Sequence, residues 1–259
     1  MVTELRTDLA SQRRERMRNL IRQAGIVRVE DLRRDLKVSV ATVRRDLEAM
    51  EDEGRVRRVH GGAISMESRL EESGFDTKTG LASKEKRLIA AESVKLISSG
   101  DSIFLDGGST VMELASLLAD RSDLTVVTNS LRAATELSNS RLRIILTGGE
   151  LRLLSQTMVG PLTRAVLDKV RVDKAFMGTM GFSIEDGFTT TDPNEAFTKD
   201  LVQKQARQVI LLADSRKWGK VSFSRVSGFD NVDVLITDKK FPAKDARALR
   251  KQDVKVRLV

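Results

Sequence analysis

The first quarter of the chain contains three stretches in which apolar residues recur at helical spacing. The first, over 12–24, carries them at positions i, i+3, i+4 and i+7, as a helix with one buried face does. A second short helix is expected around 29–36, and a third over 40–53 follows a tight turn at 37–39. The apolar positions that define these helices are Met17, Leu20, Ile21, Ala24, Val29, Leu32, Leu36, Val43, Leu47 and Met50.

The third predicted helix has a distinct outward face. Ser39 is placed to cap it, because a serine hydroxyl accepts a hydrogen bond from a backbone N–H of the first turn. Its apolar positions fall within about 60° of one another, and Arg45 lies nearly opposite them. A long donor beside small residues suits a helix that enters the DNA major groove, although an ordinary surface helix could carry the same charges. The other outward positions are Ala41, Thr42, Arg44, Glu48 and Ala49.

The segment 54–62 alternates apolar and basic residues and turns on a glycine pair. This pattern predicts a two-stranded wing beside the third helix. Its basic side chains, and the only histidine of the chain, would lie along the DNA backbone or in the minor groove. The candidate DNA-binding residues are therefore Ser39, Ala41, Thr42, Arg44, Arg45, Arg57, Arg58 and His60.

Beyond residue 82 the pattern changes to short apolar runs that alternate with helical stretches. A helix over 83–98, capped by Ser83, opens this region. Short β-branched runs separated by helices indicate a largely parallel sheet covered by helices, which places this region in the α/β class. The expected strands are Ser102–Leu105, Leu124–Val127, Arg143–Leu146, Lys174–Met177, Val209–Leu212 and Val234–Ile236, and the clearest helices between them are Thr110–Leu118, Leu131–Leu137, Pro161–Val170 and Glu195–Ala206.

Polar or glycine-rich residues follow each expected strand, as in the DGGST segment at 106–110. In an open α/β sheet, ligands bind outside the carboxyl ends of the strands. Glycines before a helix N-terminus favour an anion, and Lys217 supplies a positive charge on a facing loop. A phosphorylated polyol fits this set, with its phosphate on the glycine loop and Lys217 and its hydroxyls on Asp106, Asn129 and Asp214. Tight turns and helix caps would explain any one of these loops equally well.

Composition limits the classes of protein that fit this pattern. The chain has no cysteine and no apolar run of 18 residues, so disulfides, thiolate sites and a membrane span are not expected. The net charge is +8, and residues 1–62 carry half of it, with 15 Lys and Arg against 11 Asp and Glu. A basic small domain suits a polyanion, although a solvated charged surface is the plainer explanation. We expect a cytoplasmic protein without a cofactor or a metal site.

Several motifs resemble the DeoR family of sugar-metabolism repressors. They include VSVATVRRDL at 38–47, RVHGGA at 58–63, IILTGGELR at 144–152 and VILLADSRKWG at 209–219, and the resemblance spans roughly 12–240. It implies a winged helix-turn-helix that binds operator DNA, followed by a mainly parallel α/β sensor domain related to ribose-5-phosphate isomerase. We also expect a homodimer or homotetramer that presents paired recognition helices to operator half-sites.

The resemblance further implies a phosphorylated sugar or sugar-derived effector. The chain departs from the family in Arg216, where serine is common, which is a tolerable change. The doubled glycine of DGGST differs from some members of the family, so the identity of the effector does not carry over. The candidate effector-binding residues are Asp106, Gly107, Gly108, Ser109, Thr110, Thr128, Asn129, Gly148, Gly149, Arg152, Gly178, Glu195, Asp214 and Lys217.

We therefore expect a DNA-binding domain over 1–62, a linker over 63–82 and a sensor domain over 83–259. The alternative is a sugar-phosphate isomerase with a fused DNA-binding head, for which Asp106, Glu195 and Asp214 could supply the acid and base. The carboxylate-rich loop that such an isomerase needs is missing around 178–181. An RNA-binding protein is disfavoured by the 4% content of aromatic residues and the absence of tyrosine.

Overall fold

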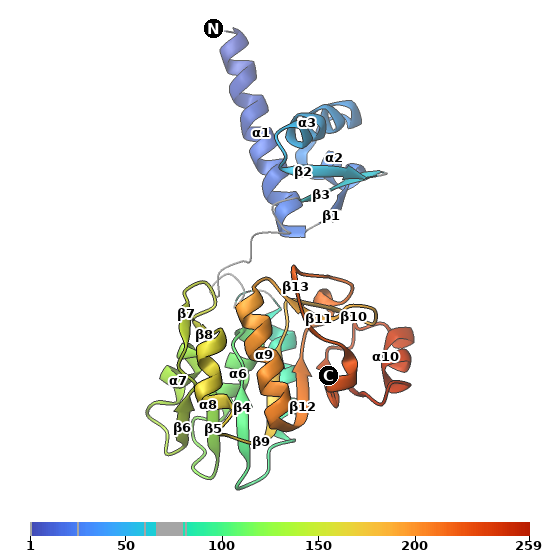
Figure 1. The fold of residues 1–259 in the computed structure, drawn as a ribbon. Coiled ribbons are helices and arrows are strands. Elements are labelled where there is room, and N and C mark those ends of the chain that lie inside the picture. The colour runs from blue at the N-terminus through green and yellow to red at the C-terminus, as the bar shows by residue number, and fades with distance from the viewer. Residues whose placement is uncertain (1, 25, 60, 66–79, 81) are drawn as a thin grey trace. The chain divides into compact units, whose positions relative to one another are not determined.

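The computed structural model describes the whole chain except residues 1, 25, 60, 66–79 and 81 (Figure 1). It divides into two compact units, Met1–Glu72 and Ser73–Val259. The domain limits expected from the sequence remain predictions, because most of the expected linker lies outside the described residues. Among the described helices, none is both long enough and apolar enough to cross a membrane.

The first unit is a winged helix-turn-helix. Its three predicted helices are confirmed, and their apolar faces enclose a small core that includes Met17, Leu32 and Leu47. The wing contains one strand more than expected, because the residues just before the second helix pair with the wing. The elements are α1 (Val2–Ala24), β1 (Ile26–Arg28), α2 (Val29–Leu36), α3 (Val40–Asp52), β2 (Val56–Val59) and β3 (Gly62–Ser65), with an antiparallel sheet order β1-β3-β2.

Two local features build the turn and the wing of this unit. Lys37 ends α2 in the left-handed conformation, with φ 53°, which brings α3 back across α2. In β3, a Cβ atom on Gly62 would lie 2.4 Å from the carbonyl oxygen of Val27. Glycine is therefore required at this position, because β1 and β3 approach each other there more closely than a side chain allows.

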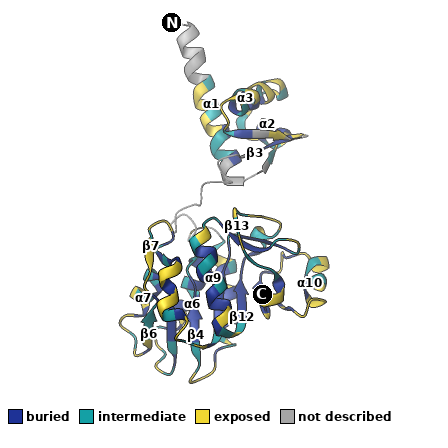
Figure 2. Cartoon of the chain, viewed as in Figure 1, coloured by how far each residue is buried: buried dark blue, intermediate teal, exposed yellow. Residues whose placement is uncertain are grey.

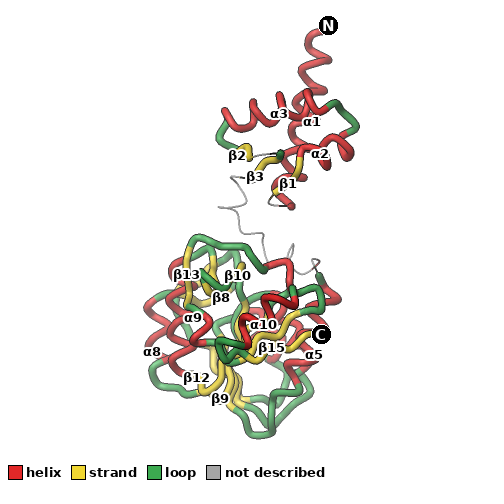
Figure 3. The backbone as a smooth tube through the Cα atoms, turned by 90° about the vertical axis from the view of Figure 1, so that its right-hand side faces the viewer, coloured by secondary structure: helices red, strands yellow, loops and turns green. Residues whose placement is uncertain are grey.

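The second unit contains a parallel sheet of seven strands in the order β15-β14-β12-β9-β4-β5-β6. Figure 3 gives a second view of this sheet, with β9, β12 and β15 labelled. The chain runs outward from β4 through β5 to β6, returns to β9 on the other side of β4, and continues outward to β15. The strand order therefore reverses between β4 and β9. The strands are β4 (Ser102–Leu105), β5 (Thr125–Thr128), β6 (Arg143–Leu146), β9 (Val172–Gly178), β12 (Ala206–Leu212), β14 (Val234–Thr237) and β15 (Lys255–Leu258).

Helices cover both faces of this sheet. Alternate residues of each strand point to opposite cores, so that Phe104 joins one core and Leu105 the other. Helices α5, α6 and α7 pack on the core of Leu105, and α8, α9 and α10 on the core of Phe104. Figure 2 shows the strands buried between these layers. The helices are α5 (Ser83–Val94), α6 (Ser109–Leu117), α7 (Leu131–Leu137), α8 (Arg164–Leu167), α9 (Pro193–Gln205) and α10 (Ala243–Arg250).

The six predicted strands are confirmed, and several other expectations need correction. Ser83 is the first residue of α5 and not its cap, which is Ala82 with φ 50°. The single helix expected over Pro161–Val170 is a 3-10 turn followed by the short α8. The helix α10 and the strand β15 were not predicted. Neither were the hairpin of β7 (Glu150–Arg152) and β8 (Thr157–Val159) and the small sheet of β10 (Gly181–Ser183), β11 (Gly187–Thr190) and β13 (Ser224–Ser227).

Candidate functional site

The outward face of α3 is formed as the sequence predicts. The Ser39 hydroxyl accepts a hydrogen bond from the Thr42 backbone N–H at 3.1 Å and lies 2.9 Å from the Thr42 hydroxyl. Ala41, Arg44 and Arg45 are exposed. Two guanidinium groups therefore stand on the exposed side of a capped helix, which is the arrangement that a major-groove reader requires.

Asp46, on the same helix, was not identified from the sequence. It is buried, and Arg13 of α1 donates two hydrogen bonds to its carboxylate, at 2.6 Å and 3.0 Å. The hydrogen bond to Asp46 raises the pKa of Arg13. The two residues are 33 positions apart in the chain, so the sequence pattern does not indicate that they pair. Their contact depends on how α1 crosses α3.

The wing lies against the end of α3. The backbone N–H of Arg58 donates a hydrogen bond to the Glu51 carboxylate at 2.7 Å. The Arg58 guanidinium lies 3.7 Å from the Glu48 carboxylate and 3.9 Å from the Glu51 carboxylate. Arg57 lies on β2 opposite Ile64. The structure does not describe its side chain, and His60 lies outside the described residues.

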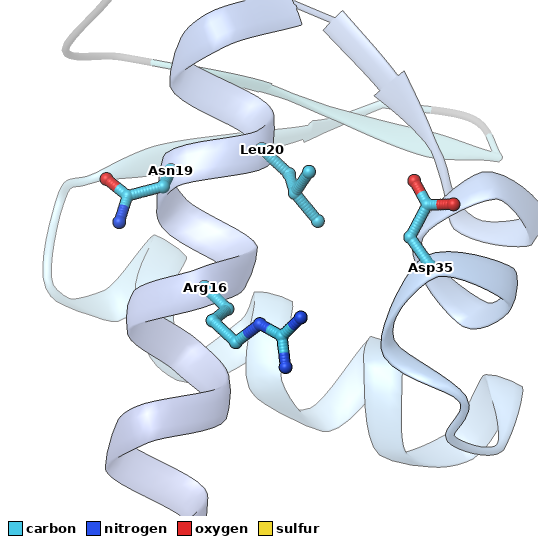
Figure 4. A pocket seen from close by; sticks show the side chains of 4 residues that line it. All are labelled: Arg16, Asn19, Leu20 and Asp35. Carbon is cyan, nitrogen blue, oxygen red and sulfur yellow. The ribbon is translucent and has the colours of Figure 1, made fainter.

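An open hollow is present between α1 and α2 in the first unit (Figure 4). Arg16, Asn19, Leu20 and Asp35 line it, and its volume is about 300 Å³. None of the candidate DNA-binding residues contributes to its lining.

In the second unit, a buried ion pair marks the point where the strand order reverses. Asp106 directly follows β4, and its Oδ2 accepts a hydrogen bond from the Gly178 N–H, at the end of β9, at 2.9 Å. The Lys199 ammonium of α9 donates to the same oxygen and, at 3.1 Å, to the Gly178 carbonyl. Asp106 is 2% exposed and Lys199 7%. Lys199 was not identified from the sequence, because it lies inside a helix and belongs to no loop motif.

The glycine loop after Asp106 combines packing with an open helix N-terminus. A Cβ atom on Gly107 would lie 2.2 Å from Thr157 Cγ2, so this glycine is required for contact with the β7–β8 hairpin. Gly108 precedes α6 with φ 115° and has open space around it. Ser109 and Thr110 are buried in the first turn of α6, and the Thr110 hydroxyl has no partner among the described residues.

Two polar side chains at the end of β5 differ in whether their oxygen atoms have hydrogen-bond partners. The Thr128 hydroxyl donates to the Leu105 carbonyl at 2.7 Å and accepts from the Ser130 N–H at 3.0 Å, so it joins the ends of β4 and β5. Asn129 Nδ2 donates to the Met158 carbonyl at 3.4 Å, whereas its buried Oδ1 has no partner among the described residues.

The β7–β8 hairpin brings Arg152 to the first turn of α9. Arg152 donates to Ser155 at 3.1 Å and lies 3.5 Å from Asp192 and 3.7 Å from Glu195. Glu195 is buried and also accepts a hydrogen bond from Thr190. Before this hairpin, Gly148 and Gly149 are exposed with φ 65° and 119°, and a Cβ atom on Gly149 would lie 2.8 Å from Thr163.

A guanidinium group binds the carboxylate that follows β12. Asp214 is 1% exposed, and Arg216 Nε donates to its Oδ1 at 2.8 Å. Burial favours a raised pKa for Asp214, but the Arg216 hydrogen bond and the charges of Lys217, Arg216 and Lys86 lower it overall. Its Oδ2 is buried and has no partner among the described residues. Lys217 reaches from the same loop to the Thr179 carbonyl at 2.6 Å.

The candidate effector residues thus lie after the carboxyl ends of β4, β5, β6, β9 and β12, on the β7–β8 hairpin and in the first turn of α9. Three of them, Thr110, Asn129 and Asp214, present buried polar atoms that have no partner among the described residues. Buried polar groups are almost always paired, so such atoms call for an explanation. Lys86 and Lys199 are buried cations of the same region that no motif indicated.

Comparisons with known proteins agree with this architecture. The family model described as the DeoR-like helix-turn-helix domain matches residues 13–69, and the DeoR C terminal sensor domain matches residues 81–239. The HTH-type transcriptional regulator YulB of Bacillus subtilis is 36% identical over 252 residues, which are 97% of each chain. The lactose phosphotransferase system repressor of Staphylococcus epidermidis is 35% identical over 231 residues, 87% of this chain and 91% of that one.

A ribose-5-phosphate isomerase solved in complex with phospho-erythronic acid is similar to part of the chain. The two are 21% identical with a TM-score of 0.41, over 52% of this chain and 54% of the isomerase. This likeness assigns no activity. The two family models and the extent of the similarity to YulB show that the chain belongs to the DeoR family of DNA-binding transcription regulators.

Proposed function

We propose that this chain represses genes of carbohydrate metabolism and that a phosphorylated sugar or sugar-derived effector, bound at the carboxyl edge of the large sheet, controls its hold on operator DNA. The buried polar atoms of Thr110, Asn129 and Asp214 that have no partner in the described part of the chain carry this proposal. They lie near the reversal of the strand order, where α/β sheets bind their ligands. The similarity to the lactose phosphotransferase system repressor of Staphylococcus epidermidis supports a carbohydrate role.

The proposed effector chemistry follows from the charges. The Asp106 carboxylate is held by Lys199 and the Gly178 N–H, and an ionised carboxylate is a strong acceptor for sugar hydroxyls. Asp214 Oδ2 and Asn129 Oδ1 are further acceptors, and the Thr110 hydroxyl can donate. Lys217 would bind the phosphate, whereas Arg152 already has Asp192 and Glu195 beside it.

The proposed DNA interface uses the exposed face of α3 and the wing. Arg44 and Arg45 would reach base edges, and the wing arginines would contact the backbone. Because operators are read as half-sites by symmetric dimers, we propose a homodimer or homotetramer. Effector binding would shift the population towards a form whose paired helices fit the operator differently.

Thermal unfolding of the full chain against sugar phosphates and the matching free sugars tests the effector class. A ligand at 100 times its Kd should add about 2.7 kcal/mol, which raises the Tm by roughly 5–10 °C. The shift should need the phosphate, should be lost in Lys217→Ala, and should persist in Lys251→Ala, a control at an exposed lysine beyond α10. The absence of a shift with every compound would refute a sugar-phosphate effector. Conversion of ribose 5-phosphate would favour the isomerase alternative.

A further inference from the structure

The β7–β8 hairpin and the 3-10 turn at Pro161–Thr163 expose a group of leucine side chains. In the described part of the chain, nine large apolar side chains are exposed, and four of these lie within 151–162: Leu151, Leu153, Leu154 and Leu162. The exposed fractions of Leu153 and Leu162 are 78% and 72%. Single exposed apolar residues are ordinary on a protein surface, whereas a group of them marks a surface that another molecule covers.

The strand register gives this hairpin two different faces. Leu151 lies opposite Met158, and Arg152 lies opposite Thr157. Because neighbouring residues of a strand point to opposite sides, the two pairs face in opposite directions. Thr157 is buried, and Arg152 lies beside Glu195 of α9, so this pair faces the rest of the second unit. The face that carries Leu151 and Met158 is therefore the outward face of the hairpin.

Hydrogen bonds to the second unit hold this outward face in place. The backbone N–H of Met158 donates to the Asn129 carbonyl at 2.7 Å. Directly after β8, the backbone N–H of Gly160 donates to the Thr198 hydroxyl of α9 at 3.0 Å. The outward face is thus formed before any partner arrives. A partner that covers it does not have to order the hairpin, which removes one of the costs of binding.

The charge of the hairpin favours a second copy of this chain as the partner. Residues 150–163 contain one acidic and one basic residue, Glu150 and Arg152, whereas the net charge of the chain is +8. Both belong to the side opposite Leu151 in the alternation of β7, so the outward face of this fully described hairpin presents no charged side chain. Such a face offers nothing to DNA or to an acidic peptide. In a two-fold interface a patch meets itself, and an uncharged apolar patch does so without repulsion between like charges.

We propose that two copies of this chain associate through the outward face of the β7–β8 hairpin, with Leu151, Leu153 and Met158, and through Leu162 beyond it. Operators are read as paired half-sites, which needs two copies held together. This inference rests on the homodimer or homotetramer of the proposed function and names the surface that forms it. It does not depend on the effector, so the two proposals can fail separately.

The first test compares the full-length wild type with Leu153→Glu and with the control Leu117→Glu, at an exposed leucine of α6. We expect the wild type to sediment as a dimer or a tetramer. Leu153→Glu should raise the concentration at which this assembly splits in half by about tenfold or more, because it places a carboxylate in an apolar interface. It should also weaken binding to a duplex that the wild type selects from a random library, and leave the affinity for a single half-site unchanged. Leu117→Glu should behave as the wild type does.

The second test shows which molecule covers the face. The chain has no cysteine, so Leu153→Cys introduces a single thiol. This thiol should react with a maleimide more slowly above the concentration at which the assembly splits than below it, whereas Leu117→Cys should react at one rate throughout. Slow reaction of Leu153→Cys at every concentration would mean that another part of the same chain covers the face, and would overturn the proposal.

The remaining outcomes separate this interface from the proposed function. An assembly that Leu153→Glu leaves intact would overturn this interface and leave the homodimer or homotetramer standing. A wild type that is monomeric at every concentration would overturn both. Equal, fast labelling of Leu153→Cys at every concentration, with an assembly still present, would place the interface on another surface.

Discussion

The Arg13 guanidinium of α1 binds the Asp46 carboxylate of α3 through both of its oxygens, with Nε 2.6 Å from Oδ2 and Nη2 3.0 Å from Oδ1. A bidentate pair fixes direction as well as distance. Asp46 directly follows Arg45, so the contact that anchors the buried side of α3 also sets the direction of its exposed side. The recognition helix is thus held by a polar contact in addition to its apolar face.

Replacing Arg13 with methionine should therefore loosen α3. The buried Asp46 carboxylate would lose its partner, at an expected cost of about 1–3 kcal/mol. Hydrogen exchange of peptides that cover α3 measures this loss within the first unit. Arg14→Met is the matched control, because Arg14 lies 3.7 Å from Glu53 in a partly exposed pair, which should contribute at most about 1 kcal/mol. Equal effects of the two substitutions would contradict an anchoring role for Arg13.

Arg45→Ala should weaken operator binding by roughly 1–3 kcal/mol and relax the base preference at one position, if Arg45 reads a guanine edge. Binding to the selected duplex and to its single-base variants measures both effects. Arg207→Ala removes the same charge from an exposed arginine of the second unit and should leave the affinity unchanged. An Arg45→Ala variant that binds as tightly as wild type would show that α3 does not enter the groove in this way.

The elements that could be predicted are those whose pattern is local. The spacing of Val43, Leu47 and Met50 is enough to predict α3. The predicted strand Ser102–Leu105 begins and ends at the same residues as β4. The short β1 has three residues and exists because Gly62 allows a close backbone approach from another segment. A local sequence pattern cannot predict a strand that depends on contact with a distant segment of the chain.

The candidate site likewise contains residues that a local pattern predicts and residues that only tertiary packing brings there. Asp106 and Asp214 follow apolar strands, so their position at the sheet edge could be predicted. Lys199 lies within a helix, and only the packing of that helix places its ammonium group beside the Asp106 carboxylate. Thr128 stays a candidate effector residue. Its hydroxyl joins β4 to β5, a contact that strand register decides and composition does not.

Lys199→Met should destabilise the second unit, because the buried Asp106 carboxylate would lose its counter-ion. Breaking a buried pair from one side costs about 3–5 kcal/mol, and removing both charges costs less. The double variant Lys199→Met with Asp106→Asn should therefore be more stable than Lys199→Met. Urea unfolding followed by the fluorescence of Trp218, the only tryptophan, reports on this unit.

The control for this prediction lies on the same helix. Lys204→Met removes an exposed lysine of α9 that pairs with Asp200 at 2.6 Å, so it should cost less than about 1 kcal/mol. Additive effects of the two substitutions at Asp106 and Lys199 would show that the pair does not act as a unit.

Gly107→Ala should destabilise the glycine loop by overpacking. The added Cβ would lie 2.2 Å from Thr157 Cγ2, and relieving such a clash costs typically about 1–3 kcal/mol. Thr157→Ser removes this methyl group and keeps the hydroxyl that lies 2.8 Å from Ser155. The double variant should therefore unfold at a higher urea concentration than Gly107→Ala alone, as followed by Trp218 fluorescence. Gly80→Ala, in open space, should change stability little. A double variant that loses the sum of the two single effects would show that Gly107 is not required by its contact with Thr157.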